Sequence, residues 1–446
     1  MFAKAIKLVL TTLACTMLPS TAGAEMGEAN LSLGRDLQEL GQTFDSLLTT
    51  GALYTLSNAA TNNELLIFYT KTDGSLEYKG SKPTGGLGSG PGELYQADPL
   101  ASQNVIAVTR NTGPSNTFLF TVNAQSNTVS SFRVNADYGL EFVAVVGSGG
   151  QFPSSIAIRN DNKVLYVMNA AFDGSVVGFE VMPDGNLRQI PNSFRSLNAG
   201  GSQVPPDQNL SPSQVEFTPD GKQLVVTIKD GFEGLVPGVV PTGNGRVLVW
   251  NLNRDGVAES SIPVVTETAN RVPFGFALTK LPTTNDLILL LTESVAPNEA
   301  VSSYKVNADG TLTVISQSVP TFQETICWMV QYNSRYAYGA NFFGDSITSY
   351  SIDGTDGSMT LLESAAAVSE AADSFPLEML ISGNFLYQLF PGSGTIGAYA
   401  IQDADGSLQK VGEYGGLEPT LKVEQGTIPA FSDLGGAAVG LAAVKF

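Results

Sequence analysis

The side chains that could perform chemistry in this chain are carboxylates, lysines and arginines, because its 446 residues include no histidine. Catalytic triads with histidine, Cys-His pairs and histidine metal sites are therefore excluded. Glu293 and Glu378 are candidate general bases, and Lys229 or Arg271 is suited to stabilise an oxyanion. A carboxylate and a cation that converge on one carbonyl group would hydrolyse a lactone.

Four further residues are candidates for binding a substrate: Gln214, Asn169, Asn341 and Trp328. Each type of candidate also has a structural interpretation. Asparagine accepts left-handed backbone angles and bonds its own backbone in turns, and tryptophan packs well between sheets. Lys229 and Glu293 can pair with each other, and Arg271 can be an ordinary surface residue.

The elements that must position these residues repeat along the chain from residue 51. The repeat marker is a tight turn, found at Asp73-Gly74, Asp137-Tyr138-Gly139, Asp184-Gly185, Asp255-Gly256, Asp309-Gly310, Asp356-Gly357 and Asp405-Gly406. Asp-Gly accepts the positive φ angles of a two-residue hairpin, which gives these residues a structural role. The shortest spacings between turns, 47 and 49 residues, are typical of four-stranded propeller blades. The sequence therefore predicts a single all-β, seven-bladed β-propeller over residues 51–446.

Within the units, apolar runs predicted as second strands end in a polar residue: Asn58, Asn123, Asn169, Lys229, Glu293 and Asn341. We expect these ends to surround one mouth of the central channel. First strands are expected to begin near Pro153, Pro212, Pro273, Ile326 and Pro376, which places Gln214, Trp328 and Glu378 near their starts. Residues 437–446 are expected to close the ring by supplying the missing inner strand of the first unit.

Three long connections rich in glycine and proline interrupt the repeat at residues 79–97, 195–211 and 230–245. Long loops on a rigid scaffold are where function usually collects.

The first residues of the chain are typical of a secretory signal peptide, predicted over residues 1–24. Lys4 and Lys7 precede an apolar stretch from Leu8 to Leu18, and Ala22-Gly23-Ala24 forms a small-residue cleavage site. Residues 25–50 contain an amphipathic pattern that predicts a short helix. No later apolar run has the ~20 residues that a membrane-spanning helix needs. We expect a secreted protein, or a periplasmic one in a Gram-negative host, in which Cys327 is a buried and unreactive thiol.

The chain is strongly acidic, with a formal net charge of −19 and a pI near 4.3. No run of lysine or arginine follows the leader, so nucleic acid is a poor partner. Asp403 and Asp405 are too few for a calcium loop. We expect no metal or other cofactor and, because a closed propeller has no free sheet edge, a monomer.

Four stretches resemble one known family: CWMVQYNSRYAYGANFFGDSITSYSI, SPSQVEFTPDGKQLVVTIKD, PFGFAL and GSGTIGAYAIQDADGSLQKV. They are similar to the secreted branch of the seven-bladed lactonase-type propellers. That family includes propeller-type 6-phosphogluconolactonases and the fungal carboxymuconate lactonizing enzymes. The resemblance implies a hydrolase or cyclase that acts on a small lactone or a carboxylated precursor.

The chain also departs from that family. The carboxymuconate enzymes are thought to use a histidine, a glutamate and arginines, and family members often have Pro-Arg-His where this chain has Pro212-Ser213-Gln214. Their mechanism therefore cannot be transferred intact. Two functions remain open: a lactonase-like enzyme, and a non-catalytic propeller that binds a carbohydrate, a surface polymer or a protein.

Overall fold

The computed structural model describes residues 48–91, 97–110, 112–114, 116–199, 203–229, 244–295, 298–415 and 438–446. The predicted signal peptide and almost all of the segment expected to contain a helix lie outside these residues. The first strand begins at Thr49, two residues before the predicted start of the propeller. Within the described ranges, no helix has the length and apolarity that crossing a membrane requires.

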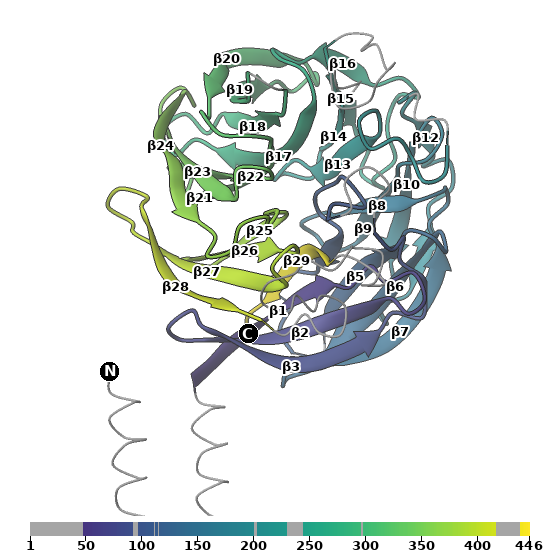
Figure 1. Ribbon diagram of the computed structural model, residues 1–446. Helices are drawn as coiled ribbons and strands as arrows, with labels where there is room; N and C mark the ends of the chain where they lie inside the picture. Colours follow the sequence, from purple (N-terminus) through teal and green to yellow (C-terminus); the bar gives the residue numbers. More distant parts are fainter. Residues whose placement is uncertain are drawn as a thin grey trace, which may run out of the picture. The chain divides into compact units, whose positions relative to one another are not determined.

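The strands form seven sheets, or blades, around one axis (Figure 1). From the axis outward, blade 1 contains β29 (Val439–Val444), β1 (Thr49–Leu56), β2 (Glu64–Lys71) and β3 (Leu76–Pro83); blade 2 contains β4 (Ile106–Val108), β5 (Thr117–Asn123), β6 (Thr128–Val134) and β7 (Leu140–Gly147); blade 3 contains β8 (Pro153–Ile158), β9 (Val164–Asn169) and β10 (Ser175–Val181). Two short strands, β11 (Leu187–Gln189) and β12 (Arg195–Ser196), both pair with the outer edge of β10 in blade 3.

The other blades have four strands each. Blade 4 contains β13 (Pro212–Phe217), β14 (Gln223–Ile228), β15 (Arg246–Asn251) and β16 (Val264–Glu267); blade 5 contains β17 (Pro273–Lys280), β18 (Leu287–Glu293), β19 (Ala300–Val306) and β20 (Leu312–Pro320); blade 6 contains β21 (Ile326–Tyr332), β22 (Tyr336–Asn341), β23 (Ser346–Ile352) and β24 (Met359–Val368); blade 7 contains β25 (Met379–Ser382), β26 (Phe385–Phe390), β27 (Thr395–Ile401) and β28 (Leu408–Tyr414).

The last strand of the chain closes the ring, as predicted. β29 pairs antiparallel with β1, with Ala443 opposite Leu53, and it also contacts the inner strands β4 and β25 on either side. The predicted seven-bladed fold is therefore confirmed. One strand boundary was wrong: the inner strand of blade 7 begins at Met379 and not at Pro376, because Glu378 bonds to a segment inside the channel.

The burial of each strand follows its position in the blade. The second strands are apolar along their length, and every residue of β9 and β22 is buried, because neighbouring blades cover both faces. In the outer strand β24 only the first residue, Met359, is buried, and the others are partly or fully exposed. The core therefore lies between the blades.

All seven Asp-Gly turns join the third strand of a blade to the fourth. Their glycines have φ between +75° and +90°, except in the turn at 137–139, where Tyr138 takes the left-handed angle. The aspartates bond within the turns, as in blade 5, where Thr311 N donates to Asp309 Oδ1 at 3.0 Å. The structural role predicted for these residues is confirmed.

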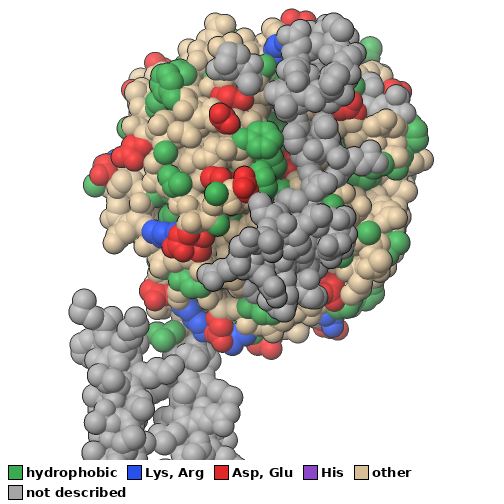
Figure 2. Space-filling view, viewed as in Figure 1, with side chains coloured by type: hydrophobic (Ala, Val, Ile, Leu, Met, Phe, Trp, Pro, Cys, Tyr) green, Lys and Arg blue, Asp and Glu red, His purple; other side chains and the backbone are tan. Residues whose placement is uncertain are grey.

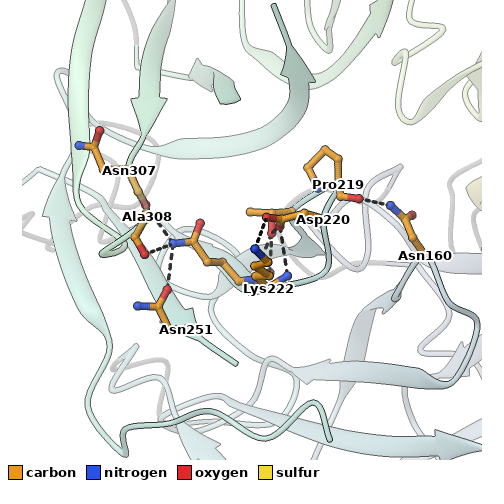
Figure 3. Close-up of polar contacts among 9 residues, drawn as sticks. Asn160, Pro219, Asp220, Lys222, Asn251, Asn307 and Ala308 are labelled. Carbon is orange, nitrogen blue, oxygen red and sulfur yellow. Dashed lines mark hydrogen bonds and ion pairs between the residues drawn. The ribbon is translucent and has the colours of Figure 1, made fainter. Parts of the chain in front are cut away.

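The same turns fasten each blade to its neighbour. A second-strand tyrosine donates its hydroxyl to a carbonyl of the next blade's turn in four places: Tyr54 to Tyr138, Tyr166 to Gly256, Tyr338 to Gly406 and Tyr387 to Gly74. The last of these joins blade 7 to blade 1. In blade 4, Gln223 takes this role, since its amide donates to the Asn307 and Ala308 carbonyls of blade 5 and to Asn251 (Figure 3).

Substituting Tyr338 by phenylalanine is expected to destabilise the propeller by about 1–2 kcal/mol, because the Gly406 carbonyl loses its buried donor. Tyr350 of the same blade is the matched control, since its buried hydroxyl has no hydrogen-bond partner. Urea unfolding of both variants measures the difference. Equal losses of stability would contradict the proposed role of the Tyr338 hydroxyl.

Candidate functional site

The meander within each blade divides the connections between two faces. The face that carries the blade-to-blade connections and the turns after the second strands is here called the joint face. The opposite face, with the Asp-Gly turns, is called the turn face. Lys229, Glu293 and Arg271 belong to joint-face connections or to strand ends beside them. Their position in the fold therefore does not show which of the three residues has a functional role, and their contacts must be compared.

The central channel is occupied by residues 98–104, which precede β4 and are called here the channel segment. Ser102 donates to the carbonyl of Ser154, and the Gln103 amide group exchanges hydrogen bonds with the backbone of Met329. Gln103 N donates to the Ser213 carbonyl at 2.9 Å. These partners lie on the inner strands of three different blades, so the segment fills the space that the ring would otherwise leave open.

Trp328 fixes the channel segment from the side. Its indole N–H donates to the Ser102 carbonyl at 3.0 Å, and its ring packs edge-on against Phe274 at 5.0 Å between ring centres. The side chain is 1% exposed. Trp328 therefore supports the segment from within the core, in keeping with the structural interpretation of this residue.

A small cavity of about 40 Å³ lies where the channel segment reaches the joint face. Its lining combines polar and apolar residues, and consists of Asp98, Ala101, Gln208, Asn209, Lys229, Val272, Phe274, Ser294, Thr325, Cys327 and Phe342. A volume of this size holds about two or three water molecules. It accepts a water and the reacting end of a ligand, but not a whole sugar ring.

Lys229 and Asp98 bring opposite charges to this cavity. The Lys229 ammonium donates to the Ala101 carbonyl at 2.7 Å and lies 4.7 Å from the centre of the Phe274 ring. Asp98 Oδ1 accepts from Ala101 N at 2.9 Å. Among the described residues the two charged ends form no direct ion pair, so each keeps capacity for another partner.

Burial perturbs the pKa of both groups. It raises the pKa of Asp98 to about 7, against the opposing effects of the Lys229 charge and the Ala101 N–H. It lowers the pKa of Lys229 to about 8, and the Asp98 charge limits that fall. Near neutral pH the pair therefore contains a base and an acid of similar strength, as acid–base catalysis requires.

The backbone around the cavity is strained. Ala101, Val272 and Thr325 have φ of +46°, +54° and +61°, angles that are uncommon for residues other than glycine and most unusual for the β-branched Val272 and Thr325. Part of this strain belongs to the blade architecture, because Phe152 has a similar φ before β8. The carbonyls of Phe152, Val272 and Thr325 each accept the N–H of the residue that follows a second strand. Several residues with strained backbone angles around one cavity are nevertheless typical of a functional site.

Cys327 also lines the cavity, and its sulfur lies 3.6 Å from the Ser294 hydroxyl. Burial raises the pKa of this thiol well above its usual value. The thiol therefore stays neutral, which disfavours a role as nucleophile.

Glu293 lies apart from this cavity, inside blade 5. Its carboxylate accepts four hydrogen bonds, from Asn270 N at 3.0 Å and from the hydroxyls of Ser302, Tyr304 and Ser318 at 2.8, 3.2 and 3.2 Å. Burial raises the pKa of Glu293, and these donors oppose the rise. The carboxylate ties strands and a connection together, and it does not pair with Lys229.

The asparagines bond within their own blades or to nearby connections. Asn341 donates to Ser346 and Thr348, Asn169 donates to Ser148 and Ser175, Asn58 holds Ser89, and Asn123 bonds Thr84 and Ser130. Gln214 bridges two inner strands, since its amide group exchanges hydrogen bonds with the backbone of Phe276. Arg271 is half-buried, one residue before Val272 of the cavity. Of the sequence candidates, Lys229 lines the cavity, and Arg271 and Trp328 each adjoin a residue that does.

Glu378 lines a different hollow, of about 310 Å³, which reaches the channel segment from the turn face. Its Oε1 accepts from Asn104 N at 3.0 Å, while its buried Oε2 has no hydrogen-bond partner. Burial raises the pKa of Glu378 to about 8, and backbone N–H groups oppose the rise. The carboxyl group is therefore mostly protonated at neutral pH.

Because the pKa of Glu378 is higher in the folded protein than in the unfolded chain, the group favours folding most at low pH. Its contribution is lost as the pH rises from about 4.5 to about 8. We expect Glu378→Gln, which resembles the protonated form, to remove part of this loss, on the order of 4 kcal/mol between those limits. Urea unfolding at pH 5 and pH 8.5 measures the change, with Glu141→Gln on the exposed strand β7 as control. An unchanged pH dependence in Glu378→Gln would contradict the prediction.

Comparison with known proteins agrees with the fold described above. Residues 102–229 match the family model described as a lactonase with a seven-bladed β-propeller. A search of curated proteins gave no match. The molecule is a seven-bladed β-propeller, and the resemblance to the lactonase-type family is confirmed over the matched residues.

Solved structures extend the likeness in fold to most of the chain. A candidate 6-phosphogluconolactonase from Bacteroides fragilis covers 89% of this chain and 98% of its own, at 16% identity and a TM-score of 0.58. A Lactobacillus plantarum protein covers 89% and 100%, at 13% identity and a TM-score of 0.61. The periplasmic gluconolactonase of Pseudomonas aeruginosa covers 81% and 96%, at 17% identity and a TM-score of 0.57. At these identities the comparison establishes the fold alone.

Asp98 and Gln208 were not among the residues selected from the sequence. Asp98 follows a long glycine-rich connection and belongs to none of the repeat markers. Gln208 donates to the Asp98 carbonyl from another such connection. The sequence did contain one indication of their importance, because both residues lie in or beside the long connections that were expected to contain functional residues.

Proposed function

We propose that this protein hydrolyses a small lactone at the joint-face cavity, with Asp98 as general base and Lys229 as the cation that stabilises the oxyanion. One observation carries the proposal: a buried carboxylate and a buried ammonium face the same cavity with pKa values shifted toward each other. The lactonase-family match and the shared fold support a reaction of this type.

In the proposed reaction, the Asp98 carboxylate accepts a proton from a water molecule while the water oxygen bonds to the lactone carbonyl carbon. The carbonyl oxygen becomes an anion and accepts a hydrogen bond from the Lys229 ammonium. When the ring C–O bond breaks, the departing oxygen takes the proton back from Asp98. The product is the open hydroxy acid, and both side chains return to their starting states.

Asp98 and Lys229 are each expected to contribute a definite factor to the rate of hydrolysis. A positioned general base typically contributes 10²–10⁴-fold, and the loss of one oxyanion donor typically costs about 10²–10³-fold. The cavity of about 40 Å³ accepts the carbonyl group and the water, so the remainder of the ring would lie outside it. Because residues 1–24 are typical of a signal peptide, we expect the reaction to take place outside the cytoplasm.

The alternative is a propeller that binds a carbohydrate, a surface polymer or a protein without catalysis. The small cavity and the filled channel favour this alternative, because neither offers a deep pocket for a complete substrate. A binding protein would not need the Asp98 and Lys229 pair.

A pH-stat assay of the mature protein with γ- and δ-lactones separates the two functions. We expect acid release by the wild type, and a fall of at least tenfold in Asp98→Asn and in Lys229→Met. Glu324→Gln is the matched control, because Glu324 is exposed and precedes Thr325 of the cavity. Circular dichroism confirms that each variant is folded.

Two results would count against the enzyme. Absence of turnover by the folded wild type across the panel would support the binding propeller. Turnover that survives unchanged in Asp98→Asn and Lys229→Met would place the reaction elsewhere on the molecule.

A further inference from the structure

We propose that the substrate of the joint-face cavity is a lactone without a negative charge, so that phosphorylated and carboxylated lactones are excluded. This inference rests on the proposed hydrolase function and narrows its substrate class. Two independent features carry it: the charges on the joint-face connections and the chemistry of the cavity walls.

Acidic residues dominate the joint-face connections. Apart from Glu378, which lines the hollow of the turn face and is mostly protonated, the described residues of these connections contain eight carboxyl groups, Asp98, Asp173, Asp207, Glu299, Glu324, Asp345, Glu370 and Asp373, and two basic residues, Lys229 and Arg271. On the face of the propeller seen in Figure 2, acidic side chains lie both near the middle and along the rim, whereas the visible basic ones lie toward the rim.

The cavity itself has few groups that could bind an anion. Its one ammonium, on Lys229, already donates to the Ala101 carbonyl and is balanced by Asp98. Much of the rest of the lining is apolar and includes Val272, Phe274 and Phe342, and the Phe274 ring lies against the Lys229 ammonium itself. A phosphate group needs several charge-assisted donors, and a buried charge without a partner carries a large desolvation cost.

The surrounding charge acts at longer range on the approach of the substrate. A net charge of −19 repels an anionic substrate and slows its association, and the repulsion weakens as salt shortens the Debye length. A neutral lactone is insensitive to this effect. The two substrate classes should therefore differ in both rate and salt dependence.

The test compares glucono-δ-lactone with its 6-phosphate at two salt concentrations, using the full mature protein. We expect kcat/KM to be at least tenfold higher for the uncharged lactone, and we expect added salt to raise the value only for the phosphorylated one. Equal values, or a preference for the phosphate, would overturn this inference and leave the proposed hydrolysis standing.

A binding measurement distinguishes the proposed hydrolysis from the inference about substrate charge if neither lactone is hydrolysed. That result would refute the proposed function, and calorimetry with the corresponding lactams, which resist hydrolysis, then tests the charge inference alone. Tighter binding of the uncharged lactam would support it. Tighter binding of the phosphorylated lactam, or binding of neither, would overturn it.

A charge-reversal variant tests the physical cause. Glu324→Lys places a cation on the exposed residue before Thr325, and we expect it to lower KM for the phosphorylated lactone severalfold while the uncharged lactone keeps its KM. Glu259→Lys, on an exposed connection of the turn face, is the matched control and should change neither KM. Equal effects of the two variants would overturn the role of joint-face charge.

Discussion

Deletion of residues 438–446 is expected to abolish cooperative folding. The deletion removes β29, whose residues Val439, Leu441 and Val444 are buried, and it exposes the edge of β1. Each buried aliphatic side chain contributes roughly 1.5–3 kcal/mol, and the ring contacts to β4 and β25 are lost as well. Together these losses are comparable to the whole stability of a domain, about 5–15 kcal/mol.

Near-UV circular dichroism and urea unfolding of the truncated protein test this expectation. The control is a shorter deletion of Lys445 and Phe446, which follow β29. Phe446 is 39% exposed and stacks on Tyr138, so the shorter deletion should cost about 1 kcal/mol or less. A cooperative transition retained by the longer deletion would show that the ring does not depend on its closing strand.

Replacement of Trp328 by alanine is expected to cost about 3–5 kcal/mol, the usual range for removing a buried aromatic side chain. The variant loses the packing against Phe274 and leaves the Ser102 carbonyl without its indole donor. Ser102 adjoins Ala101, whose carbonyl holds the Lys229 ammonium. We therefore expect lactone hydrolysis to fall as well, even in protein that remains folded.

Conservative variants separate packing from hydrogen bonding. Trp328→Phe should lose about 1 kcal/mol more than Trp250→Phe, because the buried indole N–H of Trp250 has no partner to lose. Urea unfolding measures both variants. A cost below 1 kcal/mol for Trp328→Ala would show that the channel segment does not need this support.

The fold was predictable from the sequence because its signals are local. Each Asp-Gly turn encodes its own left-handed angle, and each apolar second strand is recognisable within a few residues. Closure by the last strand followed from a missing inner strand in the first unit. The inter-blade hydroxyls of Tyr54 and Tyr338 were not predicted, because their acceptors lie in another blade.

The site was less predictable because it depends on contacts between distant residues. Gln103 bonds Met329 across 226 positions of the chain, and no local pattern indicates that residues 98–104 run through the channel. Lys229 was found because it replaces an asparagine at a repeated position. Glu293 does so too, but hydroxyls on neighbouring strands bind its carboxylate. Equivalent positions in the repeat thus have different environments.

The pH dependence of kcat/KM for an uncharged lactone tests the Asp98 and Lys229 assignment most directly. The base must be ionised and the cation protonated, so activity should rise with pH through about 7 and fall through about 8. The predicted result is a narrow bell with its maximum between these values, whose acidic limb disappears in Asp98→Asn together with most of the rate. A rate that climbs steadily with pH, or a bell that Asp98→Asn leaves intact, would contradict the account.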